Sequence, residues 1–221
     1  MSEQPAQQIA VHYARNDHQW PASIYEKYLA LLPQAMQDRI RRFHRWQDAQ
    51  ASLIGKLLLL EAWKPQGLDQ SSLRKLEYTE YQRPYLPGHA DFNITHSGNM
   101  VACAINPEGR IGIDIEVYSD IDLNDFKNLW TEAEYAHIYA PESPLSVFFH
   151  YWARKEAVIK ADGKGLSIPL KDIEISGTEG MVYNRERFYL TNLELTGDGA
   201  SWLATDKPMS LAPTLHKHVY G

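Results

Sequence analysis

The pattern WARKEAVIKADGKGL, at residues 152–166, gathers several charged residues on one predicted helix. Glu156 and Lys160 are four residues apart, so they share a helix face, and Trp152 precedes Glu156 by one turn on the same side. On an exposed helix such a pair would be a surface ion pair contributing about 0.3 kcal/mol. The tryptophan indicates instead that the acid, Lys155 and Lys160 border an apolar face, as residues that line a site do.

A second acidic motif lies in RIGIDIEVY, at residues 110–118, where apolar residues alternate with Gly112, Asp114 and Glu116. The alternation predicts a strand with the acids on one face and Gly112 leaving room beside them. Side chains two positions apart are separated by about 6.6 Å along a strand, near enough for two carboxylates to hold one cation. By itself this motif is weak, because a solvated strand face paired with lysine or arginine would look the same.

Together the three acids and two lysines suit a hard divalent cation that holds a phosphate, since Mg²⁺ takes one or two carboxylates and phosphate oxygens. The segment FNITHSG offers Thr95, His96 and Ser97, which we expect in a turn between two strands, where they could face an anion. Arg83, in QRPYLPG, is a further candidate cation.

Composition limits the remaining classes. The 221 residues are 44% hydrophobic and 23% charged, which is typical of a globular chain of one domain or of two halves of about 110 residues. A single cysteine, Cys103, excludes an intrachain disulfide, and no apolar run is long enough to span a bilayer, so we expect a cytoplasmic protein. The net charge of -6 argues against nucleic acid as a partner. The GxSxG, P-loop, GxGxxG and CxxC motifs are absent.

The elements that would position these residues are both helices and strands. Capping-box spacing at Ser23 and Glu26, and again at Thr131 and Glu134, predicts two helix starts. One long helix is expected over residues 38–63 and another over 145–163. Between them, KLEYTEY, ADFNI, MVACAI and RIGIDIEVY read as strands at the centre of a sheet, and the last 50 residues alternate like further strands.

The two motifs together resemble the signature pair of the 4′-phosphopantetheinyl transferase superfamily: GIDIE at 112–116, followed by WARKEAVIKADGKGL. NITHSG, RPYLP and RRFHRWQDAQASLIG resemble three further family segments. Length and motif order are similar to the surfactin-type subgroup, and the resemblance covers most of residues 33–170.

This resemblance implies an α+β fold of two pseudo-symmetric halves, each an antiparallel sheet packed with a long helix, with the active site at their interface. Residues 1–109 would bind coenzyme A, and residues 110–221 would carry the metal-binding and catalytic motifs. The implied reaction is Mg²⁺-dependent transfer of the phosphopantetheine arm of coenzyme A to a serine of an apo acyl or peptidyl carrier protein. Adenosine 3′,5′-bisphosphate would be the leaving group.

The resemblance also implies residue roles. Asp114, Glu116 and Glu156 would hold the metal, Glu156 would also be the base for the carrier serine, and Lys160 would be the cation nearest the transferring phosphate. The pyrophosphate and the 3′-phosphate would be held by the remaining candidates, Lys155, Arg83, Thr95 and His96. Many relatives carry an arginine where this chain has Ala51, and we hypothesise that Arg39 or another member of the DRIRRFHR cluster substitutes for it.

Two other functions use the same residues. A Mg²⁺-dependent hydrolase of a coenzyme A or nucleotide pyrophosphate would need no carrier protein, and a non-catalytic carrier-protein binder would need no metal centre. The sequence does not decide among carriers of fatty acid, polyketide, nonribosomal peptide or lysine biosynthesis, nor between Mg²⁺ and Mn²⁺. A chain built of two similar halves has little reason to pair again, so we expect a monomer.

Overall fold

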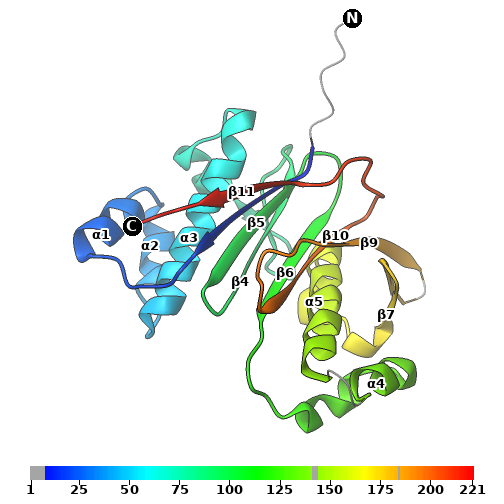
Figure 1. The fold of residues 1–221 in the computed structure, drawn as a ribbon. Helices are drawn as coiled ribbons and strands as arrows, with labels where there is room; N and C mark the ends of the chain where they lie inside the picture. The colour runs from blue at the N-terminus through cyan, green and yellow to red at the C-terminus, as the bar shows by residue number, and fades with distance from the viewer. Residues whose placement is uncertain (1–7, 141–143, 184) are drawn as a thin grey trace, which may run out of the picture.

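A computed structural model describes residues 8–140, 144–183 and 185–221 as an α+β fold built on two sheets (Figure 1). The first sheet has the strand order β11-β1-β5-β4 and the second β6-β10-β9-β8-β7. All neighbouring strands are antiparallel except β1 and β11. The strands are β1 Ala10–Arg15, β4 Asp91–Ser97, β5 Met100–Asn106, β6 Ile111–Val117, β7 Ile173–Ser176, β8 Glu179–Val182, β9 Glu186–Asn192, β10 Gly199–Thr205 and β11 Thr214–His218, with a small hairpin of β2 Glu77–Tyr78 and β3 Pro84–Tyr85.

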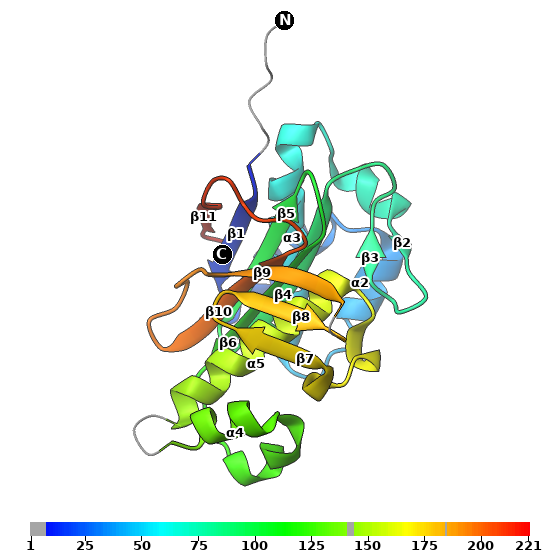
Figure 2. The ribbon, with the colours of Figure 1, turned by 90° about the vertical axis from the view of Figure 1, so that its right-hand side faces the viewer.

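Each sheet carries one long helix, α3 Trp46–Trp63 on the first and α5 Pro144–Asp162 on the second (Figures 1 and 2). Shorter helices are α1 Ala22–Leu29, α2 Gln34–Ile40 and α4 Glu132–Ile138. Single 3₁₀ turns or short 3₁₀ helices occupy Lys64–Gln66, Gln70–Lys75, Leu123–Leu129, Gly165–Ser167 and Leu170–Asp172. Among the described residues, no helix combines the length and the apolarity needed to cross a bilayer.

Helix boundaries match the expectations in part. Thr131 caps α4 as predicted, with reciprocal hydrogen bonds to Glu134. The capping box predicted at Ser23 is wrong, because α1 already begins at Ala22 after Pro21, whose ring fixes φ near the helical value without a side-chain cap. The single helix predicted over residues 38–63 is two helices, since the backbone leaves the helical region and is extended at Arg45.

The two sheets share a core, because β5 is buried on both faces. Cys103 and Val101 pack toward α3, while Ala102 and Ala104 face the isoleucines of β6. This two-sided burial explains why MVACAI is a continuous apolar run rather than an alternating one.

Strands β4 and β6 meet at a seam that side chains bridge. The backbone N–H groups of Ile111 and Ile113 donate to Asp91 Oδ2 and Asn93 Oδ1 at 2.8 and 3.1 Å, and that of Val117 donates to Ser97 Oγ at 3.2 Å. The prediction of a single sheet centre through ADFNI, MVACAI and RIGIDIEVY is therefore wrong: β4 and β5 belong to one sheet and β6 to the other. The seam brings residues of both halves within reach of one another.

The end of the chain returns to the beginning, where β11 lies beside β1 (Figure 1). A strand from the predicted second half thus completes the first sheet. The pairing stacks His12 on His216 and places His12 Nδ1 2.9 Å from His218 Nε2. Burial, followed by repulsion from these two histidines, lowers the pKa of His12 to about 4.

Candidate active site

Gly112 brings the acidic strand and the acidic helix together. A Cβ at this position would lie 2.0 Å from the backbone oxygen of Ala157 and 2.4 Å from the nitrogen of Ala161, so β6 meets α5 backbone to backbone. The isoleucines on the other face of β6 are fully buried, which fixes the orientation of the strand. Asp114 and Glu116 therefore face the same helix that carries Glu156 and Lys160.

These side chains line one pocket of about 310 Å³ between the two sheets. Its lining residues are Ile94, Thr95, His96, Asp114, Glu116, Trp152, Glu156 and Lys160. The helix face predicted from Trp152, Glu156 and Lys160 is thus confirmed as the wall of a pocket. Thr95 and His96 also reach it, but from strand β4 rather than from the predicted turn, which begins at Gly98.

Lys160 is the cation of this pocket. Its Nζ lies 2.5 Å from Asp114 Oδ1 and 3.0 Å from Thr95 Oγ1, so it joins the helix to both strands of the seam. Glu116 accepts a hydrogen bond from Ser97 Oγ at 2.8 Å. Among the described residues Asp114 Oδ2 has no hydrogen-bond partner, although it is buried, which leaves one carboxylate oxygen available to a ligand.

The three carboxyl groups are held in an environment that disfavours their charge. Burial, aided by repulsion from Asp114, raises the pKa of Glu116 to about 7. Burial raises the pKa of Asp114 and of Glu156 as well, with Lys160 acting in the opposite direction on both. A cation bound between the carboxylates would relieve this repulsion.

The carboxylates of Asp114, Glu116 and Glu156 are ligands of the type that a hard divalent cation prefers, but they do not enclose a metal position by themselves. No group of three histidine, cysteine or acidic side chains in the described part of the chain is close enough to enclose a metal ion. Mg²⁺, however, needs only one or two carboxylates when phosphate oxygens and water complete its octahedron. Asp114 Oδ2, which no residue in the described part of the chain engages, lies beside Glu116 and Glu156 in one pocket and meets that requirement.

A larger cavity of about 990 Å³ adjoins this pocket along β4, since Ile94 and His96 line both. Its walls come from α2, α3, the 3₁₀ helix Gln70–Lys75 and the β2–β3 hairpin, and include three cationic side chains, Arg39, Lys56 and Arg74. Burial lowers the pKa of Lys56, and the nearby Arg39 adds to the effect. Ala51 also lines this larger cavity. Partial burial and the charge of Lys160 lower the pKa of His96, which lies at the junction of the two cavities.

Lys155 is not among the residues brought together, which corrects its expected role as a phosphate ligand. It points to the opposite side of α5, has no exposed surface, and its Nζ lies 2.6 Å from Glu134 Oε2 and 2.8 Å from the Leu170 carbonyl oxygen. It also lies over the Trp130 ring at 5.3 Å from the centroid. One helix position separates Lys155 from Glu156, and that rotation turns the lysine into the core.

Arg83 also departs from expectation. Its guanidinium forms a bidentate pair with Asp91, at 2.7 and 2.8 Å, rather than lining either pocket, although its neighbours Gln82 and Pro84 line the larger cavity. A direct contact with a phosphate is therefore not what this arrangement presents.

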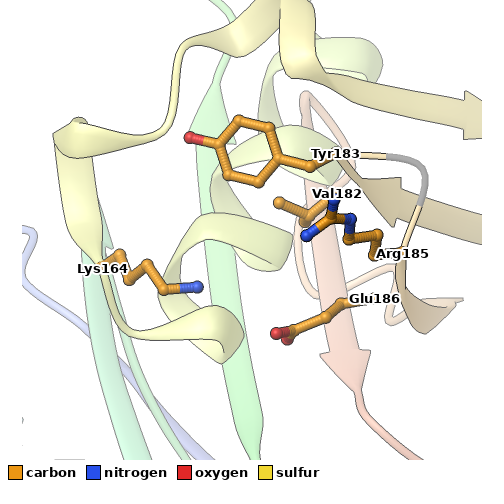
Figure 3. Close-up of a pocket in the computed structure, with 5 residues that line it drawn as sticks. All are labelled: Lys164, Val182, Tyr183, Arg185 and Glu186. Carbon is orange, nitrogen blue, oxygen red and sulfur yellow. The ribbon is translucent and has the colours of Figure 1, made fainter.

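A third cavity, of about 420 Å³, lies beside Lys164, just after the C-terminal end of α5, and shares no lining residue with the other two. Figure 3 shows Lys164 across it from Val182, Tyr183, Arg185 and Glu186. The ammonium of Lys164 is paired with Asp162 at 3.1 Å. The acids near this cavity, Asp162 and Glu186, are already paired with Lys164 and Arg110, so we do not place the chemistry there.

Asp91 and Asn93 were not predicted from the sequence, and Ser97 was expected to face an anion, yet the side chains of all three hold β6 against β4. The pattern that could have revealed them is their alternation with Thr95 in DFNITHS, which puts four polar side chains on one edge-facing side of a strand.

Comparison with known proteins identifies the family of this chain. Residues 110–210 match the model of the 4′-phosphopantetheinyl transferase superfamily, and residues 18–108 match that of the 4′-phosphopantetheinyl transferase N-terminal region. The chain is 35% identical over 155 residues to 4′-phosphopantetheinyl transferase Sfp of Bacillus subtilis (strain 168), which covers 68% of each protein.

Two further relatives carry related names. Identity is 35% over 151 residues to 4′-phosphopantetheinyl transferase gsp of Aneurinibacillus migulanus, covering 66% of this chain and 63% of the relative. It is 28% over 180 residues to L-aminoadipate-semialdehyde dehydrogenase-phosphopantetheinyl transferase of Xenopus laevis, covering 72% and 60%. The chain therefore belongs to the 4′-phosphopantetheinyl transferase superfamily and is a transferase of that family.

Proposed function

We propose that this enzyme transfers the 4′-phosphopantetheine arm of coenzyme A to a serine hydroxyl of an apo acyl or peptidyl carrier protein. The observation that carries the proposal is the common pocket of Asp114, Glu116, Glu156 and Lys160, which continues along β4 into a larger cavity with three cations. The pocket can hold a reacting phosphate, and the cavity has the volume and the charge to hold a phosphorylated nucleotide beside it.

In the proposed reaction the serine Oγ forms a bond to the β-phosphorus of coenzyme A while the phosphoanhydride bond breaks. The serine proton passes to Glu156, and adenosine 3′,5′-bisphosphate leaves. Burial raises the pKa of Glu156, which makes its carboxylate a stronger base near neutral pH. Lys160 offsets the negative charge on the transferring phosphate, the main requirement of phosphoryl transfer.

Asp114, Glu116 and Glu156 are the residues that would hold Mg²⁺, or Mn²⁺ in its place. When bound, the ion would supply positive charge against the pyrophosphate oxygens. Thr95 and Lys160 would then orient Asp114 from the side of the seam, through the hydrogen bonds that join the three side chains.

The nucleotide end of coenzyme A is assigned to the larger cavity. Arg39 takes the place of the arginine that Ala51 replaces, since both residues line this cavity. Lys56 is a second candidate for the 3′-phosphate, because its side chain lines the same cavity as Arg39. His96, at the junction of the two pockets, lies where the pyrophosphate would pass from one to the other.

We further propose that the enzyme is a monomer in the cytoplasm and acts on a carrier protein, with neither nucleic acid nor a membrane as a partner. The net charge of -6 is the reason that nucleic acid is left out of the proposal.

The test is intact-mass spectrometry of apo carrier proteins of the fatty-acid, polyketide, nonribosomal-peptide and lysine-pathway types, each incubated with the enzyme, coenzyme A and Mg²⁺. We expect at least one carrier to gain the mass of one phosphopantetheine group, and a chelator to abolish the gain. Glu156→Gln should slow the transfer by about 10²- to 10⁴-fold, because it removes the base. Glu108→Gln, an exposed glutamate outside the pocket, is the matched control and should not change the rate.

Two outcomes would contradict the proposal. Loss of coenzyme A without any carrier would indicate a pyrophosphate hydrolase. Binding of coenzyme A with no mass gain on any carrier would indicate a non-catalytic binder.

A further inference from the structure

Arg83 connects the two halves of the enzyme, although it lies outside the pocket. Its backbone is fixed in the β2–β3 hairpin, where its N–H donates to Thr79 Oγ1 at 3.2 Å and its carbonyl accepts from the Thr79 N–H at 3.0 Å. From there its guanidinium reaches three segments of the chain. It pairs with Asp91 at the start of β4, and it donates to carbonyl oxygens at the start of β6 and at the end of α5.

In the second half, the atoms that accept hydrogen bonds from the Arg83 side chain are backbone carbonyl oxygens. Arg83 Nε donates to the Lys160 carbonyl oxygen at 3.0 Å, and Nη2 donates to the Ile111 carbonyl oxygen at 2.9 Å. Because α5 ends at Asp162, the Lys160 carbonyl has no intrahelical partner, and the arginine satisfies it. Asp91 adds the reciprocal contact, since its Oδ2 accepts from the Ile111 N–H at 2.8 Å.

This network is well shielded from solvent. The side chains of Arg83 and Asp91 are only 14% and 18% exposed, in contrast to the exposed pairs on the surface. A charge-assisted bidentate pair of this kind has a defined geometry as well as a defined strength. Gly163 closes over it, because a Cβ there would lie 3.1 Å from Arg83 Cδ.

The guanidinium has little capacity left for a ligand. An arginine has five N–H donors, and the hydrogen bonds to Asp91, Ile111 and Lys160 use four of them. A phosphate could accept two hydrogen bonds from Arg83 only by displacing one of these partners, and displacement of Asp91 would also leave the Ile111 N–H without its partner.

We propose that Arg83 and Asp91 form a positioning clamp that holds the last turn of α5 and the start of β6 against the first half. The clamp fixes the register of Lys160 and Asp114 against Thr95, and it is not a ligand for coenzyme A. This inference rests on the proposed function for its kinetic readout. It differs from the role that the resemblance implied for Arg83.

The kinetic test compares Arg83→Gln, Asp91→Asn and the double variant in carrier modification. Asp91→Asn is the decisive change, because it removes the partner and leaves the arginine. For a clamp, each single variant should lower kcat by about 10- to 100-fold, as small misplacements of reacting groups do, while the Kd for coenzyme A changes less than about threefold. The double variant should be no worse than the single variants, because both remove one unit.

Arg110→Gln is the matched control. Arg110 directly precedes Ile111, yet its guanidinium pairs with Glu186 and Asp206 at the surface, where it is 41% exposed. Its loss should leave kcat unchanged. Arg83→Lys keeps the positive charge but loses the planar guanidinium that forms the bidentate pair, so this variant should behave like Arg83→Gln. If Arg83→Gln does not fold, Arg83→Lys takes its place in the comparison.

A second readout does not need activity. Hydrogen exchange of the peptides that cover residues 156–165 should become faster in Arg83→Gln and Asp91→Asn, but not in Arg110→Gln. Weakened coenzyme A binding in Arg83→Gln, with normal binding and normal kcat in Asp91→Asn, would show that Arg83 is a phosphate ligand and overturn the clamp. If the unmodified enzyme transfers nothing to any carrier, the proposed function fails, while the exchange data still decide on the clamp.

Discussion

Replacing Gly112 by alanine is expected to disable the enzyme with little loss of its fold. The added methyl group would meet the backbone oxygen of Ala157 at 2.0 Å, whereas ordinary contacts begin at 3.4 Å. The obstructing atoms belong to the backbone of α5, so no side-chain rotation can relieve the clash. The helix and the strand must instead separate by up to about 1.4 Å, the difference between these two distances.

The consequence for activity follows from which residues the two elements carry. Asp114 and Glu116 are on the strand and Glu156 and Lys160 on the helix, so the separation opens the pocket between them. A misplacement of about 1 Å lowers the rate by about 10²-fold in well-positioned sites. Overpacking of this kind typically costs about 1 to 3 kcal/mol of stability, less than a whole domain of this size can lose before it unfolds.

The assay is the rate of carrier modification at saturating coenzyme A, with urea unfolding of the same preparations. Gly197→Ala is the matched control, because its Cβ would meet no heavy atom within 4 Å and its φ is not in the left-handed region. This control should be neutral or slightly stabilising. A Gly112→Ala enzyme with normal kcat and normal stability would refute the reasoning that the backbone contact sets the geometry of the pocket.

Three further predictions concern other parts of the molecule. Lys155→Met should lower the free energy of unfolding by about 3 to 5 kcal/mol in urea titrations, because it leaves Glu134 buried without its partner, and adding Glu134→Gln should recover part of the loss. The contribution of His12 to stability should be complete above pH 6.5 and fall by up to about 3 kcal/mol toward pH 4, because His12 is protonated more readily in the unfolded chain. It is measured as the difference in the free energy of unfolding between the unmodified enzyme and His12→Gln, since the raised pKa of Glu116 acts in the opposite direction in both proteins. Arg39→Ala should raise the Kd for coenzyme A about tenfold without changing the Kd for dephospho-coenzyme A. If the variant bound both substrates with the same Kd values as the unmodified enzyme, Arg39 would be excluded as the 3′-phosphate ligand.

The acids and the helix face could be predicted from the sequence because their information is local. Alternation in RIGIDIEVY determines which face of the strand Asp114 occupies, and four-residue spacing determines that Glu156 and Lys160 share a side of α5. The two elements had only to be brought together, and Gly112, whose small size was noted in the sequence, is where they touch.

The partners of the charged residues could not be predicted in this way. Lys155 and Lys160 look equivalent in the sequence, yet Lys155 ends in the core on Glu134, 21 positions earlier, and Lys160 ends in the pocket. Similarly, the residues around Arg83 in the sequence do not show whether it is a structural arginine or a phosphate ligand, because its partners, Asp91 and the Lys160 carbonyl, lie on other elements. Long-range pairing decides whether a cation is structural or available to a substrate.

The seam between the sheets explains why the site can be both buried and charged. Had β4 and β6 been joined by an ordinary ladder, their facing backbone groups would have been used up and the side chains between them would have pointed away from the junction. Polar side chains of β4 satisfy the N–H groups of β6 instead, and the same row of residues continues as Thr95 and Ser97, which bond Asp114 and Glu116. The interaction that joins the halves is therefore continuous with the one that orients the carboxylates, and a change at either end of β4 should be felt in the pocket.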